Sequence, residues 1–147
     1  MLGVVIPAHN EQATIASCVA TVLEATRSPR LQQEEALVVV VTDSCSDATG
    51  RTAAHAGAIV IDVNARNVGA ARAAGAQLLL DRGARWLAFT DADTLVSPDW
   101  LAEQLELDAD AVCGTVGIDD WTPHGEHAEL LRSHFAQTYF DVDAHRH

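Results

Sequence analysis

The chain has 147 residues, of which 48% are apolar and 20% charged, and its formal net charge is −12 at pH 7. This length and balance predict a single soluble globular domain over residues 1–147 and exclude an intrinsically disordered chain. The acidic surplus excludes a nucleic-acid polymer as partner, because lysine and arginine would have to form a basic face to hold the phosphates. A mononucleotide, held by a metal ion and one or two arginines, is not excluded.

Cysteine usage and the N-terminal segment indicate a cytoplasmic chain, or the cytoplasmic part of a longer one. Cys18, Cys45 and Cys113 are widely spaced and odd in number, so we expect reduced thiols and no zinc cage. The opening segment MLGVVIPAHNE lacks a basic stretch, and its apolar run is too short for a signal peptide or a membrane span. We therefore predict no transmembrane segment.

The first elements follow from apolar runs and helical spacing. Residues 2–7 (LGVVIP) are rich in β-branched side chains and predict a buried strand. Apolar side chains at helical spacing then predict a helix over 10–26, with Asn10 as its N-cap. The polar stretch 27–35 predicts a surface loop, and the valine-rich run 36–42 predicts the second strand.

The same alternation continues along the rest of the chain. A second helix, capped by Ser46 or Asp47, is expected to end at Gly57. Further strands are predicted at 58–63, 86–90 and 111–118, and further helices at 67–83, 97–106 and 125–140. The regular alternation with short connections predicts an α/β fold, in which helices cover both faces of a Rossmann-like, mostly parallel sheet.

Polar side chains gather where the predicted strands end. In a parallel sheet these ends share one edge, and ligands bind there, near a topological switch point. The polar clusters are His9-Asn10-Glu11 after the first strand, Asp43 after the second, 64–67 after the third and 91–93 after the fourth. Clusters that share one edge of a sheet predict a binding site.

Asp91 and Asp93 place two carboxylates one residue apart at the end of an apolar run. Like charges this close repel each other, so the pair indicates either a solvated turn or the site of a cation. Mn²⁺ and Mg²⁺ prefer oxygen ligands, and they are usually held by one or two carboxylates together with phosphate oxygens. An Asx turn that caps the next helix is the alternative, and the neighbouring polar clusters favour the metal.

Two other side chains are candidates for ligand binding. Asp43 follows a run of valines, and its carboxylate could accept from the N–H of a base such as the imide of uracil. A helix cap is the alternative, although Ser46 and Asp47 are better placed for that role. In ARNVGAARAAG (65–75), Arg72 could reach a phosphate or a base, whereas helix packing explains the glycines as well as function does.

Taken together, these segments resemble the donor-binding half of a family 2 glycosyltransferase with the GT-A fold. The likeness covers roughly residues 3–101, and it rests on VVIPAHNE, VTDSCSDAT, RNVGAARAAG and the DxD-bearing FTDADTLVSPDWL. It implies that a sugar is transferred from a nucleotide-diphosphate sugar to an unknown acceptor hydroxyl. Family habit favours a UDP-sugar.

The resemblance also implies roles for the matching positions. The implied donor-binding residues are Pro7, Ala8, His9, Glu11, Asp43, Asn67, Arg72, Asp91 and Ala92. Glu11 would lie near the ribose or base, and Asp43 would receive the base imide. Arg72 would contact the base or the phosphates, and Asp91 the ribose or sugar. Asp93, together with Asp91, would bind Mn²⁺ or Mg²⁺ on the diphosphate.

The chain is shorter than the family's usual catalytic domain, so we expect a truncated sheet with the acceptor half largely missing. No motif assigns the general base, which must reach the acceptor hydroxyl. The candidates by chemistry alone are Asp119, Asp120, Asp141 and Asp143. A truncated sheet leaves an exposed edge or apolar face, and we therefore expect a homodimer.

Two alternative functions stay open. A donor domain without its acceptor half could bind a nucleotide without turnover, as a non-catalytic module. A more distant alternative is a phosphatase of the haloacid dehalogenase type, which also carries an aspartate pair after a strand, in a DxDx[TV] pattern. In this chain Leu95 stands where that pattern expects Thr or Val.

Overall fold

The computed structural model describes residues 1–118 and 121–138, which divide into a unit over Met1–Ala109 and a second unit that starts at Asp110. The first unit holds a four-stranded sheet of β1 (Leu2–Ala8), β2 (Ala36–Asp43), β3 (Ile59–Val63) and β4 (Trp86–Phe89). All pairings are parallel, and the strand order is β3-β2-β1-β4. Successive strands are added on one side of β1 up to β3, and β4 is then added on the other side of β1. The carboxyl ends of β1 and β4 therefore form a topological switch point.

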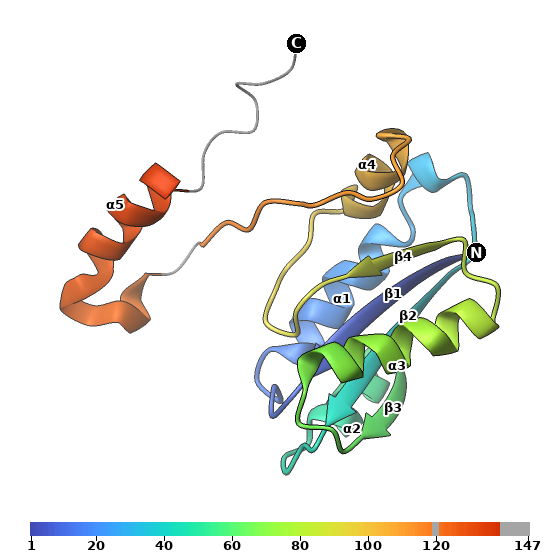
Figure 1. Cartoon of the computed structure of the whole chain (residues 1–147), viewed down its shortest axis with the longest axis horizontal. Helices are drawn as coiled ribbons and strands as arrows, with labels where there is room; N and C mark the ends of the chain where they lie inside the picture. Colours follow the sequence, from blue (N-terminus) through green and yellow to red (C-terminus); the bar gives the residue numbers. More distant parts are fainter. Residues whose placement is uncertain (119–120, 139–147) are drawn as a thin grey trace. The chain divides into compact units, whose positions relative to one another are not determined.

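Helices cover both faces of this sheet (Figure 1). One face packs against α1 (Ile15–Ala25), α2 (Thr49–Ala56) and α4 (Trp100–Glu106), and the other packs against α3 (Val68–Asp81). The strands alternate their side chains between these layers: Val4 and Ile6 face the first, and Val5 faces α3. The predicted α/β fold, with a parallel sheet covered on both faces, is confirmed.

α3 packs against the sheet at Gly75, where the backbone of the helix faces the strands without a side chain between them. A Cβ atom on Gly75 would lie 2.6 Å from Cγ1 of Val5 and 2.9 Å from Cγ2 of Val41, both nearer than packed atoms approach. Gly75 therefore serves helix–sheet packing, which was one of the two explanations that the sequence allowed for it.

Several predicted boundaries are wrong by a few residues. The first helix begins at Ile15, because Asn10 has φ of 56° and its side-chain oxygen accepts from the backbone N–H of Ser46 instead of capping α1. The fourth helix begins at Trp100 and not at Ser97. Gly57 does end α2, with φ of 106°, as predicted.

The predicted loop 27–35 is only partly a loop. It contains a short 3₁₀ turn, η1 (Pro29–Leu31), and its Leu31 packs into the core. Ser28 is buried as well, and its hydroxyl donates to the carboxylate of Asp99 at 2.6 Å. The polar composition of residues 27–35 did not indicate this, because Ser28 and Leu31 stand among polar and charged residues in the sequence.

The second unit contains η2 (Thr122–His127) and α5 (Ala128–Thr138). The strand predicted at 111–118 is wrong: this segment has no regular structure and pairs with no strand in the described part of the chain. Gly114 and Gly117 interrupt the run and weaken it as a strand, and Val116 and Ile118 are exposed. The Trp121 ring packs edge-on against Phe135, with ring centroids 5.5 Å apart.

No helix in the described ranges is long and apolar enough to cross a membrane. Among the general-base candidates, Asp119 and Asp120 lie outside the described residues, as do Asp141 and Asp143. The expected homodimer stays a prediction. It is supported by β4, which pairs only with β1 among the described strands and leaves Phe89 43% exposed.

Candidate functional site

A cleft of about 920 Å³ opens at the carboxyl ends of the strands, beside the switch point. Its walls come from the segments that follow β1, β2, β3 and β4 and from the start of α3. The lining residues are Pro7, Ala8, His9, Asn10, Glu11, Asp43, Ser44, Ser46, Arg66, Asn67, Val68, Arg72, Asp91, Ala92 and Asp93. Every donor- and metal-binding residue that the sequence predicted lies in this one cleft, while the individual roles remain predictions.

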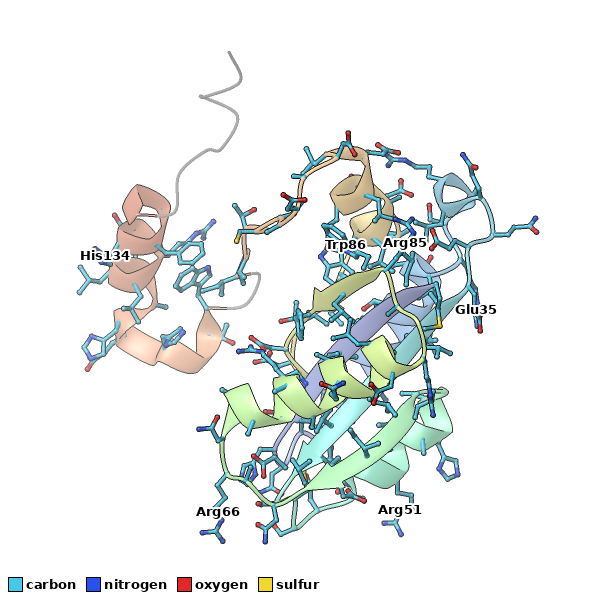
Figure 2. All side chains as sticks on the ribbon, turned by 45° about the vertical axis from the view of Figure 1, so that its right-hand side comes forward. Glu35, Arg51, Arg66, Arg85, Trp86 and His134 are labelled. Carbon is cyan, nitrogen blue, oxygen red and sulfur yellow. The ribbon has the colours of Figure 1, made fainter. Side chains whose placement is uncertain are left out.

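Asn10 and Arg66 belong to the polar clusters that the sequence predicted at this edge, although no individual role was given to them, whereas Ser44, Ser46 and Val68 were missed. Each lies within or next to a motif that the sequence did single out, so proximity to those motifs was the available signal. The Arg66 side chain is exposed and points away from the ribbon (Figure 2).

Asp43 ends β2, and only 5% of its surface is exposed. Its Oδ1 accepts from the backbone N–H groups of Ala65 and Arg66, each at 2.8 Å, and its Oδ2 accepts from the N–H of Asn67 at 2.7 Å. The Ser44 hydroxyl lies 3.0 Å from Oδ1. Burial would raise the pKa of Asp43, but these hydrogen bonds outweigh it and lower the pKa to about 2.

The turn after β1 is tied to the turn after β2. The His9 ring nitrogen Nδ1 lies 2.6 Å from the Asp43 carbonyl oxygen, and the Asn10 side-chain oxygen accepts from the backbone N–H of Ser46 at 2.8 Å. The backbone N–H of Glu11 donates to the Thr49 hydroxyl at 2.8 Å. These bonds fix the two turns to each other and form one wall of the cleft.

Asp91 forms an ion pair with Arg72, whose guanidinium nitrogen lies 2.6 Å from Oδ1 of Asp91. The Asp91 side chain is 60% exposed and that of Arg72 40%, so the pair faces solvent at the cleft and contributes little to stability by itself. The pair brings α3 and the turn after β4 together across the cleft.

The turn that carries Asp91 and Asp93 rests on the core. Ala92 is buried, and the Cys18 thiol beneath it on α1 donates to the Asp91 carbonyl oxygen at 3.3 Å. Burial, with a smaller contribution from the charge of Asp93, raises the pKa of Cys18 to about 11. The anchored Ala92 leaves the two flanking carboxylates exposed toward the cleft.

The donor set suits a metal that also binds a ligand. Among the described residues no group of three or more His, Cys, Asp or Glu side chains could hold a metal ion alone. Asp91 and Asp93 offer two carboxylates, and Mg²⁺ sites of this kind are completed by substrate phosphates and water. The residues therefore fit a divalent ion that arrives with a diphosphate.

Comparison with known proteins gives a consistent result. The model of the protein family described as "Glycosyl transferase family 2" matches residues 3–142 of this chain. The chain is similar to the crystal structure of glucosyl-3-phosphoglycerate synthase from M. tuberculosis, with 26% identity and a TM-score of 0.53 over 71% of this chain and 40% of that one. No curated protein sequence matches at a significant level.

Two structures with bound ligands share the fold. S. aureus TarS 1-349 in complex with UDP has 21% identity and a TM-score of 0.58, over 72% of this chain and 31% of that one. The M. tuberculosis synthase in complex with Mn²⁺ and UDP-glucose has 24% identity and a TM-score of 0.53, over 72% of this chain and 38% of that one. The chain thus spans less than half the length of these structures.

Proposed function

This chain belongs to glycosyl transferase family 2, and we propose that it supplies the donor site of a metal-dependent glycosyltransferase. The donor is a nucleotide-diphosphate sugar, with UDP as the nucleotide, and the sugar is transferred to an acceptor hydroxyl. One observation carries the proposal: the turns after β1, β2 and β4 and the start of α3 meet in a single cleft that contains Arg72, Asp91 and Asp93. UDP and UDP-glucose bound to neighbours of the same fold support the choice of nucleotide.

The proposed roles follow from the position of each group. The turn from Pro7 to Glu11 holds the nucleoside, and Arg72 holds the diphosphate, since a guanidinium can donate two parallel hydrogen bonds to phosphate oxygens. Asp91 would contact the ribose or sugar, and Asp93, together with Asp91, would hold Mn²⁺ or Mg²⁺. Bound there, the ion neutralises the charge that develops on the leaving diphosphate.

The ion pair of Arg72 with Asp91 gives the cleft a defined geometry. Each group is the other's counter-ion until a ligand arrives, so neither charge is left uncompensated at the cleft. A diphosphate competes with Asp91 for the guanidinium and thereby releases a carboxylate oxygen for the donor. Binding of the nucleotide and freeing of Asp91 are thus one event in this proposal.

The first experiment is calorimetric titration of the purified chain with UDP and with GDP, each with and without Mn²⁺. We expect Mn²⁺-dependent binding of UDP, and Asp93→Asn should abolish the effect of Mn²⁺ while the circular dichroism spectrum is retained. Glu103→Gln is the matched control, because it removes one exposed carboxylate of α4 outside the cleft. Unchanged Mn²⁺ dependence in Asp93→Asn would show that the metal is bound elsewhere.

Arg72→Gln tests the diphosphate contact. Losing a hydrogen-bonded charge partner costs about 1.5–3 kcal/mol, so UDP affinity should fall by roughly 10- to 150-fold. Arg82→Gln, at the opposite end of the same helix and exposed, is the control for the change of charge. Equal losses in both variants would indicate a general electrostatic effect and contradict the assignment of Arg72.

A non-catalytic module is the second candidate function, because the residues gathered in the cleft suffice for nucleotide binding and none of them is assigned as a general base. Hydrolysis of UDP-glucose separates the two functions: slow Mn²⁺-dependent release of UDP indicates a residual transferase, whereas binding without release indicates a module. Family membership argues against the phosphatase alternative, which would instead release phosphate from a generic ester without nucleotide preference.

A further inference from the structure

Most of the acceptor capacity of Asp43 is already used within the fold. An ionised carboxylate offers about four hydrogen-bond acceptor sites on its two oxygens. Both sites of Oδ1 accept from the backbone N–H groups of Ala65 and Arg66, and one site of Oδ2 accepts from that of Asn67, at 2.7–2.8 Å, so a single site on Oδ2 remains. The Ser44 hydroxyl lies 3.0 Å from Oδ1 of Asp43 and 2.7 Å from Oδ1 of Asn64. With 5% of its surface exposed, the Asp43 side chain also has little area with which to contact a base.

The three backbone donors all come from the loop between β3 and α3. Within this loop Arg66 adopts φ of 47°, a left-handed conformation that costs energy for a residue other than glycine. The bonds to Asp43 compensate this strain, because one carboxylate satisfies consecutive amides that would otherwise need water. The loop conformation therefore depends on a side chain that lies 22 to 24 residues earlier in the chain.

The loop forms one wall of the cleft and starts the helix that carries Arg72. Arg66, Asn67 and Val68 all line the cleft. Asn67 is the N-cap of α3, and its side-chain oxygen accepts from the backbone N–H of Ala70 at 3.0 Å. Any change that releases the Asn67 backbone from Asp43 would thus disturb both this wall and the first turn of α3.

We infer that Asp43 is a positioning residue, which anchors the β3–α3 loop as a wall of the nucleotide cleft and does not itself read the base. This inference rests on the proposed function for the identity of the ligand, and it changes the role that the family resemblance implies for Asp43. Its consequence is that the preference for one base comes from other groups of the cleft.

The anchoring is tested on the wild-type chain without any ligand. Hydrogen exchange followed by NMR should show the amides of Ala65, Arg66 and Asn67 protected from solvent, although the residues are exposed and lie in a loop. In Asp43→Asn the side-chain nitrogen cannot accept, and exchange of these amides should quicken by at least about 10-fold. Amides that exchange at the rate of a free loop in the wild type would overturn the inference.

The matched control is Ser44→Ala. It removes the hydroxyl that contacts Oδ1 of Asp43 and Oδ1 of Asn64, but it leaves the three backbone hydrogen bonds to Asp43 in place. Exchange at Ala65–Asn67 should change by less than about 3-fold in this variant. The measurement on the wild-type chain holds even if Asp43→Asn fails to fold.

Base reading is tested with UDP and CDP, because uracil N3 carries a proton to donate and cytosine N3 accepts one. If Asp43 anchors the loop, Asp43→Asn weakens the binding of UDP and of CDP by the same factor. The ratio of the two affinities then stays within about 2-fold of the wild-type ratio. If Asp43 reads the base, the ratio shifts toward CDP by about 10-fold or more, since the new amide can donate to cytosine N3. Such a shift would overturn the inference.

The two tests separate this inference from the proposed function. Protected loop amides in a wild-type chain that binds neither nucleotide would refute the donor site and leave the anchor established. Binding of UDP to a chain whose loop amides are unprotected would support the donor site and refute the anchoring role of Asp43.

Discussion

Gly75→Ala is the most informative single change for the way α3 is seated on the sheet. The added Cβ would lie 2.6 Å from Cγ1 of Val5 and 2.9 Å from Cγ2 of Val41. Both valines are fully buried in central strands, so neither can turn away into solvent. The helix must therefore shift outward, and Arg72, one turn earlier on α3, must shift with it.

The expected loss of stability is the difference between two terms. Overpacking a core costs about 1–3 kcal/mol, and two contacts below 3.0 Å point to the upper part of this range. Replacing glycine by alanine inside a helix stabilises the helix by about 1 kcal/mol. The free energy of unfolding should therefore fall by about 2 kcal/mol.

Urea unfolding followed by circular dichroism measures this loss. With a slope of about 2 kcal/mol per molar urea, the midpoint should fall by about 1 M while the slope is unchanged. Ala73→Gly, at an exposed position of the same helix, is the matched control, because it measures the helix-propensity term without any packing change. UDP affinity should also decrease in Gly75→Ala, since the displaced Arg72 no longer meets Asp91 as it does in the native chain.

An unchanged or higher midpoint in Gly75→Ala would refute the reasoning. It would mean that α3 accommodates a methyl group without cost, and that the close approach of α3 to β1 and β2 does not set the position of Arg72.

Two further predictions concern titratable groups. The Cys18 thiol is fully buried, and its pKa is raised to about 11. At pH 8 a disulfide reagent should therefore modify the half-exposed Cys45 and the exposed Cys113, and should reach Cys18 only after denaturation. Equally fast reaction of all three thiols would contradict the packing of Cys18 beneath the turn that carries Asp91 and Asp93. The hydrogen bond from Arg85 lowers the pKa of Glu34 from its ordinary 4.5 to about 2, and the loop amides lower that of Asp43 from 3.8 to about 2. Both carboxylates have a lower pKa in the folded chain than in the unfolded chain. Their contribution to the free energy of unfolding is therefore complete above about pH 4.5 and is lost as the pH falls toward 2. A urea midpoint that stays constant from pH 5 to pH 2 would contradict this prediction.

The amino-acid sequence by itself determined the four strands of the sheet, the order of the helices and the edge of the sheet at which the site lies. These features depend on local patterns: continuous β-branched runs such as that of β2, helical spacing, and Gly57 at the end of a helix. Because the strands of such a fold are parallel, residues that follow them must share one edge, and Asp43 and Asp91 did prove to line the same cleft.

Only the tertiary structure decided what each of these side chains contacts. The donors to Asp43 lie 22 to 24 residues further along the chain, and Arg72 meets Asp91 across 19 residues. No local pattern encodes such pairs, since they depend on how closely α3 approaches the sheet at Gly75. Residues 111–118 show the converse: their composition is that of a strand, but a strand also needs a neighbour to receive its hydrogen bonds, and that requirement is met or missed in three dimensions only.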